Sequence, residues 1–286
     1  MQQTMQPYPA RRRRAALLGR VLVLSSLVVL AACAKDKVDD LALDDTPPAV
    51  LYNQGLALRA AGKLSDAGKK FSQLDKAYPY SEYSRKALIN LAYLNFSMGK
   101  YPETIAAAQR FLQLYPGSDD AAYALYLQGQ SYYRQIPDVS RDQEETQKAL
   151  ASFSELLQRY PDSEYAPDAR KRLLMVQDQL AGKEMSVGRF YLKKRDYVAA
   201  INRFKDVILH YQTTRHVEEA LARLTEAYYA LGVVSEAQTA AAVLGHNFPD
   251  SQWYKDSYDL LKKGGYSPSE DKSSWISRAF SSVKIL

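Results

Sequence analysis

The residue whose chemistry the sequence specifies most clearly is Cys33, the single cysteine of the 286-residue chain. One cysteine cannot form a disulfide within the chain, so its thiol needs another explanation. It follows Leu30-Ala31-Ala32, where the small alanine side chains leave the backbone open to a peptidase. Residues 21–32 are apolar, too short to cross a bilayer and preceded by four consecutive arginines, as in a secretory signal. We therefore expect cleavage before Cys33 and a lipid on its thiol.

This arrangement resembles the lipobox of bacterial lipoproteins. The resemblance implies that residues 1–32 are a signal peptide and that Cys33 carries an S-linked diacylglycerol and an N-linked acyl chain, with no other cofactor. Several acyl chains attach a protein durably, whereas one chain binds only marginally. Because Ala34 rather than aspartate follows the cysteine, similarity to sorted lipoproteins implies the outer membrane, with the body facing the periplasm. The alternatives are an ordinary signal peptide with a chance cysteine and an N-terminal membrane anchor.

Charge distinguishes the signal from the rest of the chain. Residues 1–32 contain five basic residues and no acidic one, so the remainder keeps 33 basic and 32 acidic residues, a net charge of +1. This balance lacks the basic surface that nucleic acids require, and no nucleic-acid partner is expected. Residues 33–47 are polar and acidic, and we expect them to be a tether between the lipid and the body.

Side chains that catalyse reactions or bind metals are not grouped in a familiar pattern. His210, His216 and His246 are scattered, without the four-residue spacing of a helical metal site. The sequence has no glycine-rich phosphate loop, no Gly-x-Ser-x-Gly elbow and no His-Glu-x-x-His pattern. We therefore expect neither a metal site nor an enzyme.

The body is punctuated by a recurring aromatic-Pro-x-Ser pattern. Proline ends one helix and serine caps the next, so each occurrence marks a junction between helices. The interval is 37 residues from Pro79 to Pro116 and again from Gln212 to Pro249. The junctions are Tyr78-Pro79-Tyr80-Ser81, Tyr115-Pro116-Gly117-Ser118, Tyr160-Pro161-Asp162-Ser163 and Phe248-Pro249-Asp250-Ser251, with Tyr211-Gln212-Thr213-Thr214 as a fifth that lacks proline. Tight inner turns lie between them at Gly62-Lys63, Gly99-Lys100, Arg195-Asp196 and Gly232-Val233.

Helix, tight turn, helix and junction is the organisation of the tetratricopeptide repeat (TPR) family, which this pattern resembles. A small residue such as Gly129 lets paired helices approach closely, and a large one such as Phe153 fills the remaining gap. The resemblance implies an all-α fold, a TPR superhelix (α-solenoid) of five helix-pair repeats plus a C-terminal capping helix from Trp253 to Leu261. An unrelated helical bundle is the alternative.

Two departures from the period predict local features. Repeat three has an inner loop eight residues longer than the others, at about 136–142. The next junction comes fourteen residues late, which predicts one long helix over 164–194. We expect repeats one to three over 48–162, repeats four and five with the capping helix over 163–263, and a flexible tail over 264–286.

The first helices of stacked TPRs line a concave surface, where a ligand would bind. The helical register places aromatic side chains on this surface, with an arginine near each end. The candidate groove residues are Tyr52, Arg59, Tyr93, Phe96, Tyr126, Tyr133 and Arg134. Rigid rings give contact area at low entropic cost, and arginine can bind a carboxylate through two hydrogen bonds. The groove suits an extended peptide ending in an aromatic residue and a free carboxylate. Interhelix packing of the same rings is the alternative.

The lipobox, tether and repeats together resemble the TPR lipoprotein subunits of the outer-membrane β-barrel assembly machinery. The segments that carry the resemblance are Tyr78-Pro79-Tyr80-Ser81-Glu82-Tyr83-Ser84, Arg141-Asp142-Gln143, Tyr160-Pro161-Asp162-Ser163-Glu164-Tyr165 and Tyr197-Val198-Ala199-Ala200-Ile201-Asn202-Arg203-Phe204. The resemblance implies that the N-terminal repeats bind unfolded outer-membrane protein precursors through a C-terminal signal. It further implies that the C-terminal repeats dock on the periplasmic domains of the barrel subunit, with Arg203 as the candidate contact. Smaller lipoprotein subunits would be further partners.

Other functions remain open at this point. A pilus-assembly or cell-envelope TPR lipoprotein scaffold would share the anchor and the repeats. The longer connections and the inserted loop in repeat three favour the assembly machinery over a pilus-assembly scaffold. A cell-envelope factor would often carry a coiled-coil segment, which the sequence lacks. An enzyme would need a catalytic group that the repeats conceal.

Overall fold

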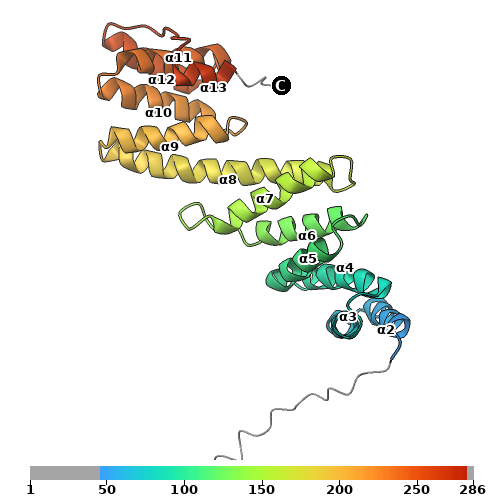
Figure 1. The fold of residues 1–286 in the computed structure, drawn as a ribbon. Helices are drawn as coiled ribbons and strands as arrows, with labels where there is room; N and C mark the ends of the chain where they lie inside the picture. Colours follow the sequence, from blue (N-terminus) through green and yellow to red (C-terminus); the bar gives the residue numbers. More distant parts are fainter. Residues whose placement is uncertain (1–45, 282–286) are drawn as a thin grey trace, which may run out of the picture. The chain divides into compact units, whose positions relative to one another are not determined.

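The computed structural model describes residues 46–281, and these residues form twelve helices, α2 to α13 (Figure 1). The helices are α2 Pro48–Ala60, α3 Leu64–Ala77, α4 Glu82–Ser97, α5 Tyr101–Leu114, α6 Ala121–Tyr133, α7 Glu144–Arg159, α8 Ala166–Lys193, α9 Tyr197–His210, α10 Val217–Ala230, α11 Val234–Asn247, α12 Gln252–Lys263 and α13 Trp275–Ser281. The all-α fold is confirmed.

The helices pack in the order expected of stacked pairs. The pairs are α2 with α3, α4 with α5, α6 with α7, α8 with α9, and α10 with α11, and α12 packs on α10 and α11. The first helices of neighbouring repeats also touch, α2 with α4, α4 with α6, and α6 with α8. These first helices therefore share one face. The solenoid of five helix pairs with a capping helix is confirmed.

Close approach within a pair depends on a glycine opposite a phenylalanine. Phe153 of α7 has 0% of its surface exposed and lies against Gly129 of α6. A Cβ atom at Gly129 would lie 2.7 Å from Cε1 of that ring, closer than real Cβ contacts allow. The same arrangement recurs at Gly188, where a Cβ would lie 2.5 Å from Phe204. The small and large positions of the repeat are thus matched partners in the pairs α6–α7 and α8–α9.

Replacing Gly129 by valine should destabilise the chain by about 1–3 kcal/mol, because the added side chain overpacks a filled core. Urea unfolding of the Gly129→Val variant measures this. Gly117→Val is the matched control, since a Cβ at Gly117 meets nothing within 4 Å. Equal stability of the two variants would contradict the packing role of Gly129.

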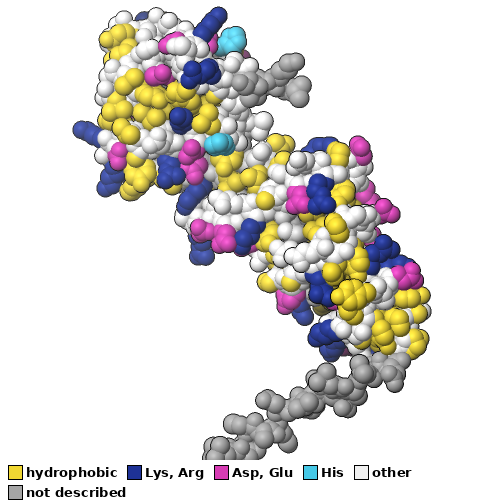
Figure 2. Space-filling model, in the orientation of Figure 1, with side chains coloured by type: hydrophobic (Ala, Val, Ile, Leu, Met, Phe, Trp, Pro, Cys, Tyr) yellow, Lys and Arg dark blue, Asp and Glu magenta, His cyan; other side chains and the backbone are white. Residues whose placement is uncertain are grey.

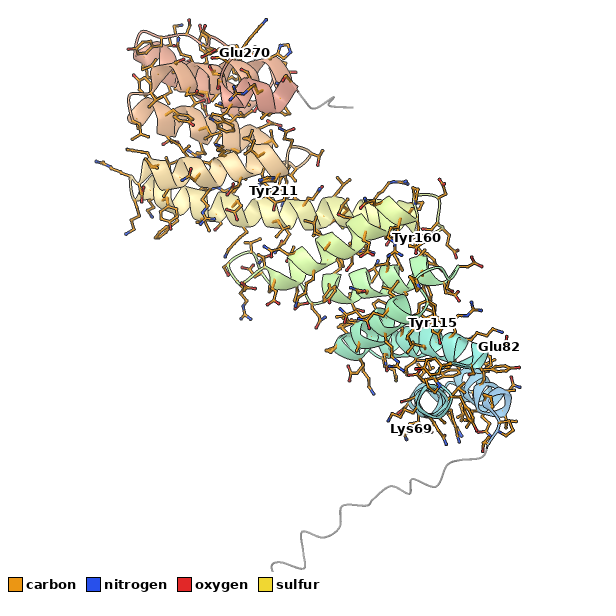
Figure 3. All side chains as sticks on the ribbon, in the orientation of Figure 1. Lys69, Glu82, Tyr115, Tyr160, Tyr211 and Glu270 are labelled. Atoms are coloured by element: carbon orange, nitrogen blue, oxygen red, sulfur yellow. The ribbon has the colours of Figure 1, made fainter. Side chains whose placement is uncertain are left out.

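The junction tyrosines form a ladder of hydrogen bonds between successive repeats. The hydroxyl of Tyr115 donates to the carbonyl oxygen of Pro79 at 3.1 Å, and that of Tyr160 donates to the carbonyl oxygen of Pro116 at 3.1 Å. Tyr78 donates to the carbonyl oxygen of Thr46 in the same way. Figure 3 labels Tyr115 and Tyr160 at these junctions. Tyr115 and Tyr160 thus tie their own junction to the preceding one, and Tyr78 ties the first junction to Thr46, ahead of α2.

The long helix predicted over 164–194 is α8, which has 28 residues and a length of about 42 Å. It packs against α6 and α7 and also against α9. The inserted loop of repeat three is bound to its middle. Gln179 donates to the carbonyl oxygen of Pro137 at 2.9 Å, and Lys183 donates to those of Ser140 and Arg141 at 3.1 Å. The insertion and the long helix are therefore one structural unit.

The C-terminal part of the chain corrects one expectation. Residues 264–286 were expected to be a flexible tail, but α13 lies within them and its Ile276 is fully buried. The helix packs on α9 and α11, far from it in sequence, which is why helical periodicity over so few residues did not reveal it.

Most of the segment expected to anchor the chain lies outside the residues that the structure describes. The signal peptide, Cys33 and all but the last two residues of the tether fall outside residues 46–281. Within the described residues, no helix combines the length and the apolar character needed to cross a membrane.

Candidate peptide-binding groove

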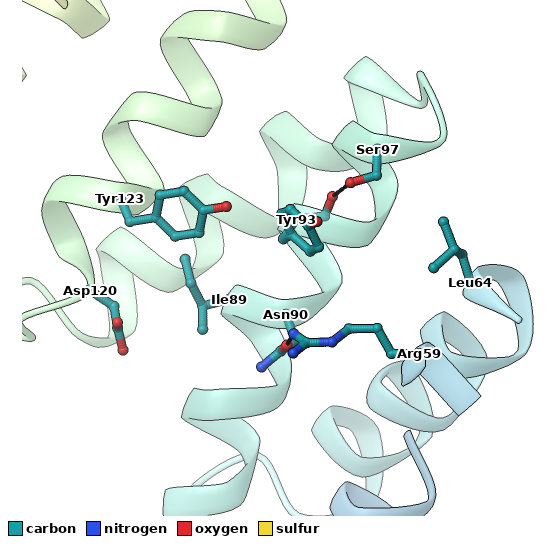
Figure 4. A pocket seen from close by; sticks show the side chains of 8 residues that line it. All are labelled: Arg59, Leu64, Ile89, Asn90, Tyr93, Ser97, Asp120 and Tyr123. Carbon is teal, nitrogen blue, oxygen red and sulfur yellow. Dashed lines mark hydrogen bonds between the residues drawn. The ribbon is translucent and has the colours of Figure 1, made fainter. Parts of the chain in front are cut away.

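An open pocket of about 490 Å³, which we call the N-terminal pocket, lies mainly on the first helices of repeats one to three (Figure 4). It is lined by Arg59, Leu64, Ile89, Asn90, Tyr93, Ser97, Asp120 and Tyr123. Two of the predicted groove residues, Arg59 and Tyr93, are brought together here, although they come from different repeats. The pocket therefore lies on the face where a TPR ligand was expected.

Arg59 supplies a positive charge at one side of this pocket. The residue is exposed, and its guanidinium donates a hydrogen bond to Oδ1 of Asn90. Asn90 in turn donates from Nδ2 to the carbonyl oxygen of Lys86 at 2.8 Å, which orients the amide. A neutral amide positions the guanidinium without cancelling its charge. Arg59 is thus held ready for an anionic group.

Two tyrosine rings, those of Tyr93 and Tyr123, also line the pocket. Tyr93 is 41% exposed, and Tyr123 is half-buried beside it. Burial raises the pKa of Tyr123 to about 12, so its hydroxyl stays neutral at physiological pH. The Tyr123 ring stacks on Tyr165 at 5.0 Å, and Tyr165 stacks on Tyr126 at 5.1 Å. This stack holds the rings in fixed positions, as suits an apolar contact surface.

The stack leads to a polar cluster between α6 and α8. The hydroxyl of Tyr126 donates to Oδ2 of Asp168 at 2.8 Å, and Nε2 of Gln130 donates to the same oxygen at 2.9 Å. Burial, reinforced by Asp168, raises the pKa of Tyr126. Arg172 lies over the ring of Tyr133, with its guanidinium carbon 4.8 Å from the ring centre. Tyr126 and Tyr133 thus do not line the N-terminal pocket and are engaged within the protein.

The remaining predicted groove residues have other positions. Tyr52 packs between Phe71 and Tyr83, with ring centres 5.8 Å from each. Phe96 packs against Tyr101 at 5.9 Å. Arg134 is exposed at the C-terminal end of α6 and does not line the pocket. The rings of Tyr52 and Phe96 thus pack between helices, as the alternative interpretation expected.

Sequence reasoning missed several lining residues. Tyr123 lies one helical turn before Tyr126, so the three-residue spacing on α6 could have identified it. Asp120 is the N-cap residue of α6 and lies outside the helical register used for the prediction. Asn90 lies three residues before Tyr93 on α4, so the same spacing could have identified it as well. The pocket thus draws on caps and turns as well as on helix faces.

In the C-terminal repeats, the predicted contact residue Arg203 is partly exposed on α9. Its Nη1 forms an ion pair with Oε2 of Glu184 on α8 at 3.1 Å. Nearby, Arg189 of α8 makes two hydrogen bonds to Glu219 of α10, at 2.8 and 2.7 Å. Basic side chains here are paired with acidic ones, and Figure 2 shows both signs interspersed over the face in view.

Comparison with known proteins identifies the family. Residues 44–244 match the family model described as YfiO, outer membrane lipoprotein. The chain is 45% identical over 257 residues to the outer membrane protein assembly factor BamD of Caulobacter vibrioides, covering 90% of this chain and 83% of that one. It is 42% identical over 248 residues to the BamD of Rickettsia prowazekii, covering 86% and 96%. A solved tetratricopeptide repeat protein from Parabacteroides merdae aligns over 82% of this chain and 76% of its own, with 17% identity and a TM-score of 0.34.

Within residues 46–281, no group of three or more His, Cys, Asp or Glu side chains is placed to hold a metal ion.

The sequence similarity covers most of the chain and therefore shows its family. The chain belongs to the YfiO family of outer membrane lipoproteins, which includes the outer membrane protein assembly factor BamD.

Proposed function

We propose that this chain is a non-enzymatic outer-membrane lipoprotein that promotes the assembly of outer-membrane proteins. Its N-terminal pocket binds the C-terminal segment of an unfolded precursor, and its last repeats dock on the barrel subunit of the assembly machinery. The observation that carries the proposal is an exposed guanidinium, held by a neutral amide, beside two tyrosine rings. Membership of the BamD family supports the assembly role.

The chemistry of the pocket defines the peptide it accepts. The free carboxylate of a chain end pairs with Arg59, and a terminal aromatic side chain packs on Tyr93 and Tyr123. Asp120 lies at the opposite side of the pocket from Arg59 in Figure 4. Its negative charge repels a carboxylate there, so the peptide binds in one orientation, with its end at α2.

The anchor and the docking surface complete this proposal. Lipidated Cys33 holds the chain at the periplasmic side of the outer membrane, and residues 33–47 give it reach. Arg203 contacts the periplasmic domains of the barrel subunit, while smaller lipoprotein subunits are further partners. A pilus-assembly or cell-envelope scaffold remains the alternative, and it would not require recognition of a free chain end.

Peptide binding tests the pocket. A peptide ending in phenylalanine with a free carboxylate should bind about tenfold more weakly to the Arg59→Ala variant, because one charge-assisted hydrogen bond is lost. The same peptide with an amidated end should bind the native chain and the variant equally. Fluorescence anisotropy with a labelled peptide measures both affinities.

Arg134→Ala is the matched control for this experiment, because it removes an exposed arginine of the same repeats that lies outside the pocket. It should leave the affinity unchanged. If Arg59→Ala weakens the acid and the amide to the same extent, the carboxylate is not the group that Arg59 recognises. A native chain that does not distinguish acid from amide would favour the scaffold alternative.

A further inference from the structure

The segment after α12 has two parts with different surroundings. Residues 265–273 are exposed except for the partly exposed Pro268. Residues 274–277 are partly or fully buried, with Ile276 at 0% exposure in the core cluster of repeats four and five. Ala279 and Phe280 pack against the same cluster. An exposed connector followed by a buried helix is the arrangement of a tethered ligand.

Polar side chains of α9, α10 and α11, and of the junction after α9, contact α13. The indole Nε1 of Trp275 donates to the hydroxyl of Tyr228 on α10 at 3.1 Å. The ammonium of Lys205 on α9 lies 5.0 Å from the centre of the same indole. These contacts fix both the polar edge and the face of one aromatic side chain.

Both ends of α13 are bound as well. At its start, the hydroxyl of Ser274 donates to Oε2 of Glu236 on α11 at 2.7 Å. At its end, Nε2 of Gln212, in the junction after α9, donates to the carbonyl oxygen of Ala279 at 3.1 Å. The contacts span repeats four and five. They match the features of a short helix: a capping serine, a tryptophan edge and a free terminal carbonyl.

A helix of seven residues does not form alone in water, so α13 folds because it docks. We propose that α9, α10 and α11 form a helix-docking site on repeats four and five, occupied in cis by α13. The ligand that fits is a short amphipathic helix with the pattern Ser-Trp-Ile-x-x-Ala-Phe, as in residues 274–280. Any partner helix of this kind must displace α13 to bind. This inference is independent of the N-terminal pocket.

The connector determines how the site is controlled. The connector, residues 265–273, is short and is itself hydrogen-bonded to α11: Nε2 of Gln238 donates to the carbonyl oxygen of Ser267 at 2.7 Å, and the backbone N–H of Asp271 donates to Oγ1 of Thr239 at 3.1 Å. A short link of this kind gives the tethered helix an effective concentration of about a millimolar. A free peptide at micromolar concentration therefore cannot displace it from the intact chain. Cutting the connector removes this advantage, so that a free peptide can replace α13 in the docking site.

The test uses the full chain with a protease site inserted between Ser269 and Glu270, which are both exposed. The folded protein is cut, and a labelled peptide of residues 270–286 is added at micromolar concentration. Anisotropy should show saturable one-to-one binding to the cut chain and none to the uncut chain. A competitor peptide with Trp275→Ala should be at least about tenfold weaker than the native peptide, whereas Lys272→Ala, at an exposed position, should compete equally well.

Circular dichroism of the cut chain confirms that its helices persist. If the folded cut chain does not bind the peptide, or if the Trp275→Ala peptide competes as well as the native one, the docking site is disproved. Equal binding to the cut and uncut chains would show that the peptide binds elsewhere.

Discussion

Replacement of Cys33 by serine should abolish lipid attachment, because a hydroxyl cannot form the thioether. Incorporation of labelled palmitate should fall to background in this variant. A companion variant, in which a cleavable periplasmic signal replaces residues 1–33, should move from the membrane to the soluble fraction. The expected loss of membrane attachment is nearly complete, since the proposed acyl chains are the group that attaches the chain durably.

Ala34→Asp is the control that separates attachment from sorting. It keeps the thiol, so labelled palmitate should still be incorporated, while similarity to sorted lipoproteins predicts retention in the inner membrane. Unchanged membrane attachment of the companion variant would refute the lipid anchor. Palmitate labelling of Cys33→Ser would show that the lipid is attached elsewhere.

The helix boundaries were predictable because their causes are local. Proline and a capping serine act within a few residues, so the late junction at Gln212 was enough to predict one helix over 164–194. The structure places this helix at Ala166–Lys193. Ser81 and Ser251 accept a hydrogen bond from a backbone N–H of the helix that follows, as N-caps should. The prediction was wrong for Ser118 and Ser163, because α6 and α8 begin later, with Asp120 and Tyr165 as their N-cap residues.

Features that depend on distant partners were not predictable in this way. Helix α13 owes its position to Lys205 and Tyr228, about 70 and 47 residues before Trp275. Tyr52 was expected in the groove, and its partly buried ring packs against those of Phe71 and Tyr83. Helical spacing shows which face a residue is on, and the neighbouring helix decides whether that face is open.

The same limit applies to charge. Arg203 was identified from a segment shared with the family, but its partner Glu184 belongs to the preceding helix. Replacing Arg203 therefore has two separate effects. It removes the ion pair with Glu184, and it removes the proposed contact with the barrel subunit. An experiment on docking has to separate them.

The variant Arg203→Glu should lower copurification of the barrel subunit by about tenfold, because it reverses the charge of the proposed contact. It also places a carboxylate opposite Glu184, which weakens the packing of α9 on α8. Copurification from detergent-solubilised membranes measures docking, and thermal unfolding of the purified chain measures stability.

The charge-swapped pair Arg203→Glu with Glu184→Arg distinguishes the two effects, because it restores the ion pair with its polarity reversed. If Arg203 contacts the barrel subunit, the swap recovers thermal stability but not copurification. If Arg203 serves only to hold α9 against α8, the swap recovers both, and the docking contact must be sought elsewhere on repeats four and five. Because the ion pair is partly exposed, its own contribution to stability is small, and a tenfold loss of docking is large by comparison.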